Sequence, residues 1–253
     1  MRLWTLSERF VQLAQKPRRG WTMRGIKGGE TAYEHSLEMR DMAHKLVPRH
    51  YPHLDPVYAG EMCMIHDTPE CVDTDWTPHD NISARQKEKW EYRALGFMRC
   101  NTYPRELMEQ VYLIFDEHQK GTSPTARLTR QLDKLQLARQ TLRYEQAHPQ
   151  MNMHDMWDYA AKALIDLPLI RIFENLKQQR PEGIERLPLT VARKLTEDDE
   201  KLGKEAVIAR IGNFDHVTIE REQAFEKYPF KNDLKSRIRV WAMRTPWIDR
   251  YLP

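Results

Sequence analysis

Residues 57–67 read Val-Tyr-Ala-Gly-Glu-Met-Cys-Met-Ile-His-Asp, and they set the architecture of the chain. Glu61 is the only charged residue before the His-Asp pair that ends the stretch. A segment that is apolar almost all round is typical of a helix enclosed by other elements. The stretch therefore predicts a buried helix from about Val57 to Ile65 that runs into His66-Asp67.

Helical spacing of apolar residues extends outward from this segment in both directions. Thr5 and Glu8 are spaced as a capping box, and Ser123-Pro124 is typical of an N-cap followed by the first helical residue. No alternation of period two accompanies these patterns, and glycine is scarce, with 10 residues. We therefore predict an all-α fold, a helical bundle. Further helices are expected at about residues 7–15, 31–47, 83–98, 104–117, 124–145 and 155–177.

Composition excludes several classes of protein. The chain has 253 residues with a formal net charge of +3, which is too small to indicate nucleic-acid binding. Its three cysteines form no CxxC pair, so neither a disulfide framework nor a zinc ribbon is indicated. No apolar stretch has the length of a signal peptide or a membrane span. We expect a cytoplasmic protein that does not enter a membrane.

Composition changes after Gln179, where Pro181, Gly183 and Pro188 indicate a loop or linker. We therefore divide the chain into a core of residues 1–179 and a C-terminal extension of residues 180–253 that packs on it, with a role that the sequence does not indicate. Within the extension we expect a short strand at 207–211 and helices at 217–228 and 231–243. Residues 227–253 are rich in Lys and Arg, which fits a solvated packing helix or a patch for an anionic partner.

The His66-Asp67 pair is the first candidate for chemistry. Adjacent helical residues point about 100° apart, so the pair suits a site where two ligands approach one ion from different directions. A histidine at a helix end is also commonly just a cap. Asp133 strengthens the metal interpretation, because it interrupts an apolar run between Leu132 and Leu135, and a buried carboxylate must be paired or bind a cation.

His35, near the start of an earlier helix, adds a second imidazole. Two imidazoles and two carboxylates form a mixed nitrogen and oxygen set that suits one divalent ion such as Mn, Co, Zn, Fe or Mg, with positions left open for water and substrate. A structural zinc site would more often use thiolates. The open coordination indicates a catalytic metal.

The order His35, His66-Asp67, Asp133 resembles the H…HD…D signature of the HD-domain metal-dependent phosphohydrolases. Over about residues 10–175 the chain resembles more specifically the HD-domain 5′-deoxynucleotidases. The matching motifs, in order, are Arg18-Arg19-Gly20-Trp21, Glu30-Thr31-Ala32-Tyr33-Glu34-His35, His66-Asp67-Thr68-Pro69-Glu70-Cys71, Asp75, Asp80-Asn81-Ile82 and Gln131-Leu132-Asp133. The pattern departs at Thr125, where the family commonly has a glutamate, and after about residue 180, where no counterpart exists.

The resemblance implies a role for each matched residue of the catalytic centre. The metal ligands would be His35, His66, Asp67 and Asp133. Glu70 would act in proton transfer beside the bound water and the leaving group, so the catalytic residues would be Glu70 and Asp67. Without the resemblance, Glu70 would equally well be a surface glutamate.

For the substrate, the resemblance implies that Asp75 contacts the deoxyribose 3′-hydroxyl and that Trp21 packs on the base. Trp21 could instead be a core tryptophan. Arg18 is the nearer match to the phosphate-binding arginine of the family, and Arg19 is the reserve, because the guanidinium geometry fits phosphate oxygens.

The implied activity is hydrolysis of deoxyribonucleoside 5′-monophosphates to deoxynucleoside and phosphate, with a small nucleotide as partner and a homodimer as the first expectation. Two alternatives stay open. One is a related triphosphohydrolase that acts on deoxynucleoside triphosphates. The other is an HD scaffold without catalysis that binds a nucleotide or a macromolecular partner.

Overall fold

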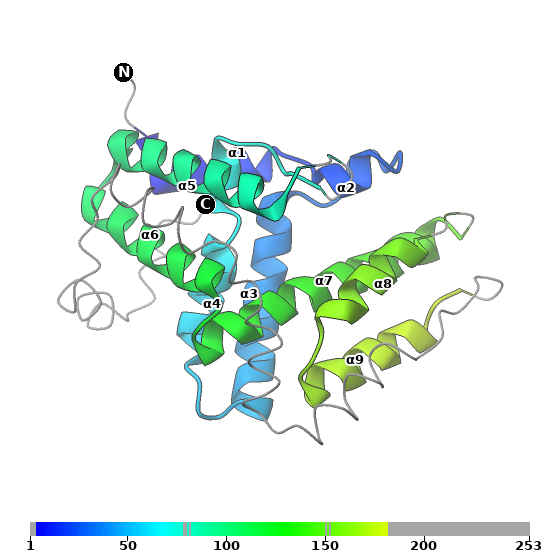
Figure 1. The fold of residues 1–253 in the computed structure, drawn as a ribbon. Coiled ribbons are helices and arrows are strands. Elements are labelled where there is room, and N and C mark those ends of the chain that lie inside the picture. The colour runs from blue at the N-terminus through cyan, green and yellow to red at the C-terminus, as the bar shows by residue number, and fades with distance from the viewer. Residues whose placement is uncertain (1–3, 78–79, 81, 150, 152, 182–253) are drawn as a thin grey trace.

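The computed structural model describes residues 4–77, 80, 82–149, 151 and 153–181. Regular structure in these residues is almost entirely helical (Figure 1), so the all-α fold class is confirmed. Two short strands, which the sequence did not indicate, pair in parallel with Trp4 opposite Thr102. The elements in chain order are β1 (Trp4–Thr5), α1 (Leu6–Ala14), α2 (Arg19–Thr22), α3 (Ala32–His50), α4 (Pro56–Ile65), the 3₁₀ helix η1 (Thr68–Cys71), α5 (Ala84–Asn101), β2 (Thr102–Tyr103), α6 (Arg105–Lys120), α7 (Pro124–Ala147), α8 (His154–Ala163) and α9 (Leu167–Gln178).

Helix α4 lies between two hydrophobic clusters, as its all-round apolar sequence predicts. Met62 and Ile65 belong to a cluster with residues of α1, α5 and α6. Ala59 and Cys63 belong to a second cluster with residues of α3, α7, α8 and α9. Asp55 caps α4 by accepting from the amides of Val57 and Tyr58. The C-terminal end of α4 therefore delivers His66-Asp67 to the middle of the fold.

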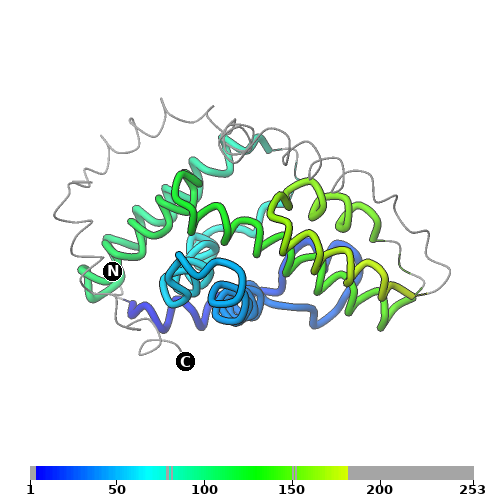
Figure 2. Tube along the Cα trace, turned by 90° about the horizontal axis from the view of Figure 1, so that it is seen from below, coloured from blue at the N-terminus to red at the C-terminus, as the bar shows by residue number. Residues whose placement is uncertain are grey.

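The remaining helices pack around α3 and α4. Helix α3 packs mainly on α4 and also contacts α7. Figures 1 and 2 show α5 and α6 on one side of this centre, and α8 and α9 beside α7 on the other. The first turn of α3, the end of α4 and the middle of α7 meet where the two halves join.

Most of the predicted helices are present, but the single helix expected at 155–177 is wrong. The structure has α8 and α9 instead, separated at residues 164–166. Pro168 belongs to the first turn of α9, where its missing amide is tolerated. The side chain of Gln131 on α7 accepts from the amides of Ile165 and Asp166, both at 2.9 Å, and so stabilises the break. The structure also has the short helix α2 between the helices expected at residues 7–15 and 31–47.

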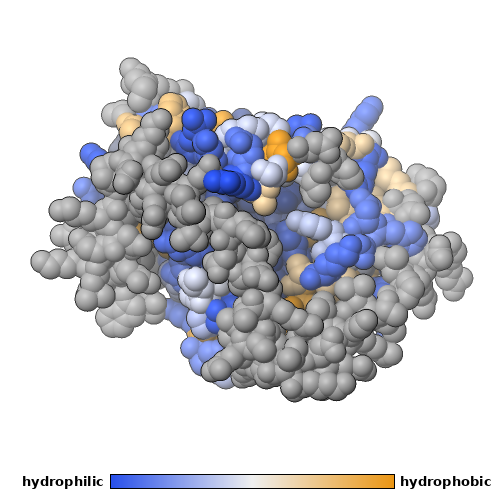
Figure 3. Space-filling view, in the orientation of Figure 1, coloured by the Kyte–Doolittle hydropathy of each residue, from blue (hydrophilic) through white to orange (hydrophobic). Residues whose placement is uncertain are grey.

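The elements expected at 207–211, 217–228 and 231–243, and the basic stretch 227–253, lie outside the described residues. Arg180, the first residue assigned to the extension, is buried: its guanidinium contacts Glu145 on α7 at 2.6 Å. Among the described residues no helix is long and apolar enough to cross a membrane. On the face shown in Figure 3 the described residues are mostly hydrophilic.

Candidate metal centre

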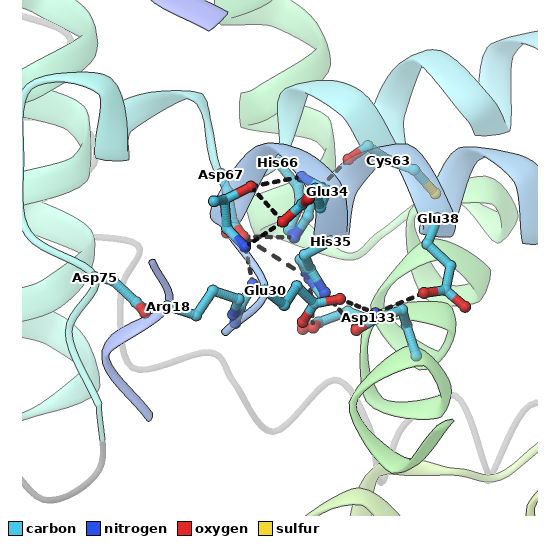
Figure 4. Close-up of polar contacts among 12 residues, drawn as sticks. Arg18, Glu30, Glu34, His35, Glu38, Cys63, His66, Asp67, Asp75 and Asp133 are labelled. Carbon is cyan, nitrogen blue, oxygen red and sulfur yellow. Dashed lines mark hydrogen bonds and ion pairs between the residues drawn. The ribbon is translucent and has the colours of Figure 1, made fainter. Parts of the chain in front are cut away.

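Three helices each bring a candidate ligand to one point. His35 lies in the first turn of α3, His66 directly follows α4, and Asp133 lies in α7. One ligand atom from each of these three residues lies within 4.8 Å of the others. Figure 4 shows these side chains pointing toward one another, with Asp67 beside the two imidazoles. The Asp67 Oδ2 atom lies 3.1 Å from His66 Nε2 and 3.8 Å from His35 Nε2.

Hydrogen bonds on the far side of each imidazole orient both rings. His66 Nδ1 donates to the carbonyl of Cys63 at 2.7 Å. His35 Nδ1 lies 2.5 Å from Gln136 Oε1, and the Gln136 amide nitrogen donates to Glu30 and Glu38. Because that amide group faces two carboxylates, its oxygen faces His35, and Nδ1 must be the protonated ring nitrogen. Both Nε2 atoms therefore face Asp67 and Asp133, on the side where each could offer its lone pair to a metal ion.

The arrangement fits a divalent cation. His35 Nε2 is buried and has no hydrogen-bond partner among the residues that the structure describes, although Asp133 Oδ1 lies 3.3 Å away. Two imidazole nitrogens beside two carboxylates form a set that suits Mn, Co, Zn, Fe or Mg. A buried polar atom without a hydrogen-bond partner costs free energy, and a bound cation would remove that cost. His35, His66 and Asp133 would be the ligands that are already gathered, and Asp67 would complete the set.

The two carboxyl groups are held in their ionised form. Burial alone would raise the pKa of Asp67, but the adjacent His66 and the Arg18 guanidinium lower it well below its ordinary value. Burial would likewise raise the pKa of Asp133, and Lys134 and His35 lower it instead. Lys134 Nζ lies 2.6 Å from Asp133 Oδ2. Both groups are therefore ready to act as ligands.

Glu70 lies in η1, close to this cluster, and is only 4% exposed. The alternative of a surface glutamate is therefore wrong. Its Oε2 atom is buried and has no hydrogen-bond partner in the part of the chain that the structure describes. Burial, together with the charges of Asp67 and Asp75, raises the pKa of Glu70 well above its ordinary value. A carboxyl group in this state keeps its proton at a higher pH than an exposed one.

The two candidate arginines have different surroundings. Arg18 Nη1 lies 3.0 Å from Asp67 Oδ2, so its guanidinium reaches the metal cluster (Figure 4). The Arg19 guanidinium contacts Asp80 Oδ1 at 2.6 Å instead, while its backbone amide donates to Asp75 at 2.7 Å. Arg18 is therefore the arginine that the fold places at the cluster, and Asp75 lies beside the same short segment.

Trp21 has a core position. Its ring is 1% exposed, lies 4.9 Å from the ring of Tyr144, and belongs to a cluster with Ile26 and Met153. Its indole nitrogen donates to Glu30. Base packing by Trp21 would require this ring to leave the core, so the structure favours the core alternative for this residue.

Two residues that contact the ligands were missed from the sequence. Gln136 holds His35, and Lys134 pairs with Asp133. Both follow Asp133 on α7, and Gln136 lies three residues later, on the same helical face. That spacing is a weak signal, because only the fold shows that His35 lies opposite this face.

Comparisons with known proteins match the part of the chain that carries the candidate metal ligands. A family model described as HD domain matches residues 10–166. A cattle protein named 5'-deoxynucleotidase HDDC2 is 26% identical over 174 residues, which cover 68% of this chain and 83% of that protein. The fission yeast 5'-deoxynucleotidase hdd1 is 25% identical over 167 residues, covering 65% of this chain and 82% of that protein.

Two solved structures of archaeal proteins share the fold. PH0347 from Pyrococcus horikoshii superposes with a TM-score of 0.53 at 24% identity, covering 68% of this chain and 94% of that one. A conserved hypothetical protein from Pyrococcus furiosus has a TM-score of 0.54 at 24% identity, covering 67% and 96%. Since the family model spans well over half of the sequence and the ligand cluster lies within the matched residues, the chain belongs to the HD-domain family.

Proposed function

We propose that the protein is a metal-dependent 5′-deoxynucleotidase that hydrolyses deoxyribonucleoside 5′-monophosphates to deoxynucleoside and phosphate. The observation that carries the proposal is the buried Glu70 carboxyl near a His/His/Asp cluster that Arg18 also reaches. The names of the cattle and yeast relatives support the same substrate class.

A divalent ion bound by His35, His66, Asp67 and Asp133 would lower the pKa of a coordinated water and neutralise charge on the phosphate. The attacking water would form a new P–O bond as the bond from phosphorus to the 5′-oxygen breaks. Arg18 is suited to hold phosphate oxygens, because a guanidinium donates two parallel hydrogen bonds. Asp67, which stays ionised, is suited to accept a hydrogen bond from the water.

Glu70 would supply the proton that the leaving 5′-oxygen needs. Its raised pKa keeps the carboxyl protonated closer to neutral pH, which suits a general acid. Asp75 would accept a hydrogen bond from the 3′-hydroxyl, a role for which an ionised carboxylate is suited.

A substrate panel tests the activity. Purified protein is incubated with deoxynucleoside monophosphates, ribonucleoside monophosphates and deoxynucleoside triphosphates, each with Co²⁺, Mn²⁺ or Mg²⁺, and both phosphate and nucleoside are measured. We expect phosphate and deoxynucleoside from the monophosphates. Intact monophosphates together with triphosphate release from the deoxynucleoside triphosphates would overturn the proposal in favour of the triphosphohydrolase. No metal-stimulated hydrolysis and no bound metal would favour a non-catalytic scaffold.

Two variants separate metal binding from proton transfer. Asp133→Ala should lose both bound metal and hydrolysis while it keeps its helical circular dichroism. Glu70→Gln should keep the metal and lose about 10²- to 10⁴-fold in kcat, the usual contribution of general acid catalysis. Asp41→Ala is the matched control, because Asp41 is exposed on α3. Loss of metal in Glu70→Gln would instead make Glu70 a ligand.

The homodimer stays a prediction that light scattering of the purified protein would test.

A further inference from the structure

We propose that Lys16 is a positioning residue that sets the place of Glu70 in the catalytic centre. The Lys16 Nζ atom donates to the backbone carbonyl of Glu70 at 2.5 Å and to that of Asp73 at 2.9 Å. One ammonium group thus joins the segment before Arg18 to Glu70 within η1 and to Asp73 just after it. The inference rests on the proposed function only in that Glu70 acts in proton transfer.

Glu70 depends on its main chain for its position. Within the described residues, the buried Oε2 atom of its carboxyl has no hydrogen-bond partner. The peptide groups of Glu70 are anchored on both sides: the amide donates to the backbone carbonyl of Asp67 at 2.9 Å, and the carbonyl accepts from Lys16. The turn η1 is a 3₁₀ helix of four residues, a form whose own hydrogen bonds have poor geometry. Cys71 ties the turn to α1 through a bond from its thiol to the carbonyl of Arg9, and Lys16 is the outside donor that acts at Glu70 itself.

The backbone of Lys16 is itself anchored to the start of α3. Its carbonyl accepts from the amide of Ala32 at 3.1 Å, and Arg18 donates from its amide to the carbonyl of Glu30 at 2.9 Å. Pro17 and Thr31 form an antiparallel bridge between these two bonds. Helix α3 carries His35, so the Lys16 backbone is tied to a metal ligand while its side chain is tied to the Glu70 turn.

Lys16 therefore connects three parts of the site: the ligand helix, the Arg18 segment and the Glu70 turn. Its ammonium group suits the task because it offers three donors and no acceptor, and it serves two carbonyls at once. An arginine keeps several donors of similar reach, whereas a methionine of similar length keeps none. With methionine at position 16, the carbonyls of Glu70 and Asp73 would lose their side-chain donor, and η1 would be free to shift away from the candidate ligands.

The test compares Lys16→Met, Lys16→Arg and the control Lys45→Met, whose lysine is exposed on α3. Steady-state hydrolysis of a deoxynucleoside monophosphate gives kcat and KM, elemental analysis gives bound metal, and hydrogen–deuterium exchange reports the amides of residues 70–73. In Lys16→Met we expect kcat to fall at least tenfold with KM within twofold, full metal content, and faster exchange at 70–73. Lys16→Arg should recover kcat to within threefold of the unmodified protein.

Several results would overturn the proposal. These are an unchanged kcat in Lys16→Met, an equal loss in Lys16→Arg, or a loss of metal with unchanged exchange at 70–73. If Lys16→Met does not fold, Lys16→Gln provides a milder comparison, because its amide still donates but is uncharged and reaches less far; a fall in kcat and faster exchange at 70–73 are expected again. If the unmodified protein does not hydrolyse monophosphates, the proposed function fails by itself, and the exchange measurement still decides whether Lys16 holds the turn.

Discussion

Replacing Gln136 with leucine should weaken metal binding although Gln136 is not a ligand. The Gln136 oxygen, 2.5 Å from His35 Nδ1, keeps the proton of the imidazole on the side away from the cluster. Without this acceptor the proton is free to move to Nε2, which lies 3.3 Å from Asp133 Oδ1. The resulting hydrogen bond between His35 and Asp133 would have to break before either residue could bind a metal.

The size of the effect follows from this competition. Loss of such an outer partner typically costs about 10- to 100-fold in metal affinity, which corresponds to about 1.4 to 2.7 kcal/mol. Calorimetric titration of the metal-free protein with Co²⁺ measures it, with circular dichroism to confirm that the fold persists. Gln146→Leu is the control, since Gln146 is exposed on the same helix. A dissociation constant within twofold of the unmodified protein in a folded Gln136→Leu would refute the reasoning.

Two further predictions concern stability. Arg180→Met leaves the buried Glu145 carboxylate without its ion pair, which should cost about 3 to 5 kcal/mol and lower Tm by about 6 to 20 °C. Thermal unfolding checks this, and a shift no larger than that of the exposed control Arg171→Met would contradict it. Burial, followed by the nearby charges of His66 and Arg130, lowers the pKa of His118 well below 6.5. The unfolded chain therefore binds the extra proton first, and stability should fall as pH drops below about 6.5, by up to about 1.4 kcal/mol per pH unit. In the metal-free protein, denaturant titrations between pH 6.5 and 5 should show that His118→Leu reduces the slope of the free energy of unfolding against pH. The exposed control His53→Leu should leave the slope unchanged. An unchanged slope in His118→Leu would refute the prediction.

The parts of the fold that local sequence determines were predictable. The capping box of Thr5 and Glu8 is present at the start of α1, and Ser123 caps α7. The break between α8 and α9 was not predictable from local sequence. It depends on the side-chain oxygen of Gln131, which accepts hydrogen bonds from two backbone amides more than thirty positions away. Tertiary hydrogen bonds of this kind override helical spacing.

The same distinction applies to the candidate site. The candidate ligands could be singled out because imidazoles and carboxylates are rare in apolar helical runs, so His66-Asp67 and Asp133 stand out. Whether Glu70 and Trp21 are buried could not be decided from the sequence, since each lies in a turn-rich segment without a periodic pattern. Gln136 and Lys16 were beyond reach, because their partners lie 101 and 54 positions away and a glutamine or lysine carries no signal by itself.

The charges at the site explain why the net charge of the chain carries so little information about its ligand. Two cations already contact the ligand carboxylates: Arg18 touches Asp67, and Lys134 touches Asp133. Without a metal these pairs balance one another, and a phosphate dianion would have to displace Asp67 from Arg18. A divalent ion shared by the two carboxylates would take over part of their charge and leave the Arg18 guanidinium more available to phosphate. Metal and phosphate should therefore favour each other's binding, because each relieves a charge that the other leaves unpaired.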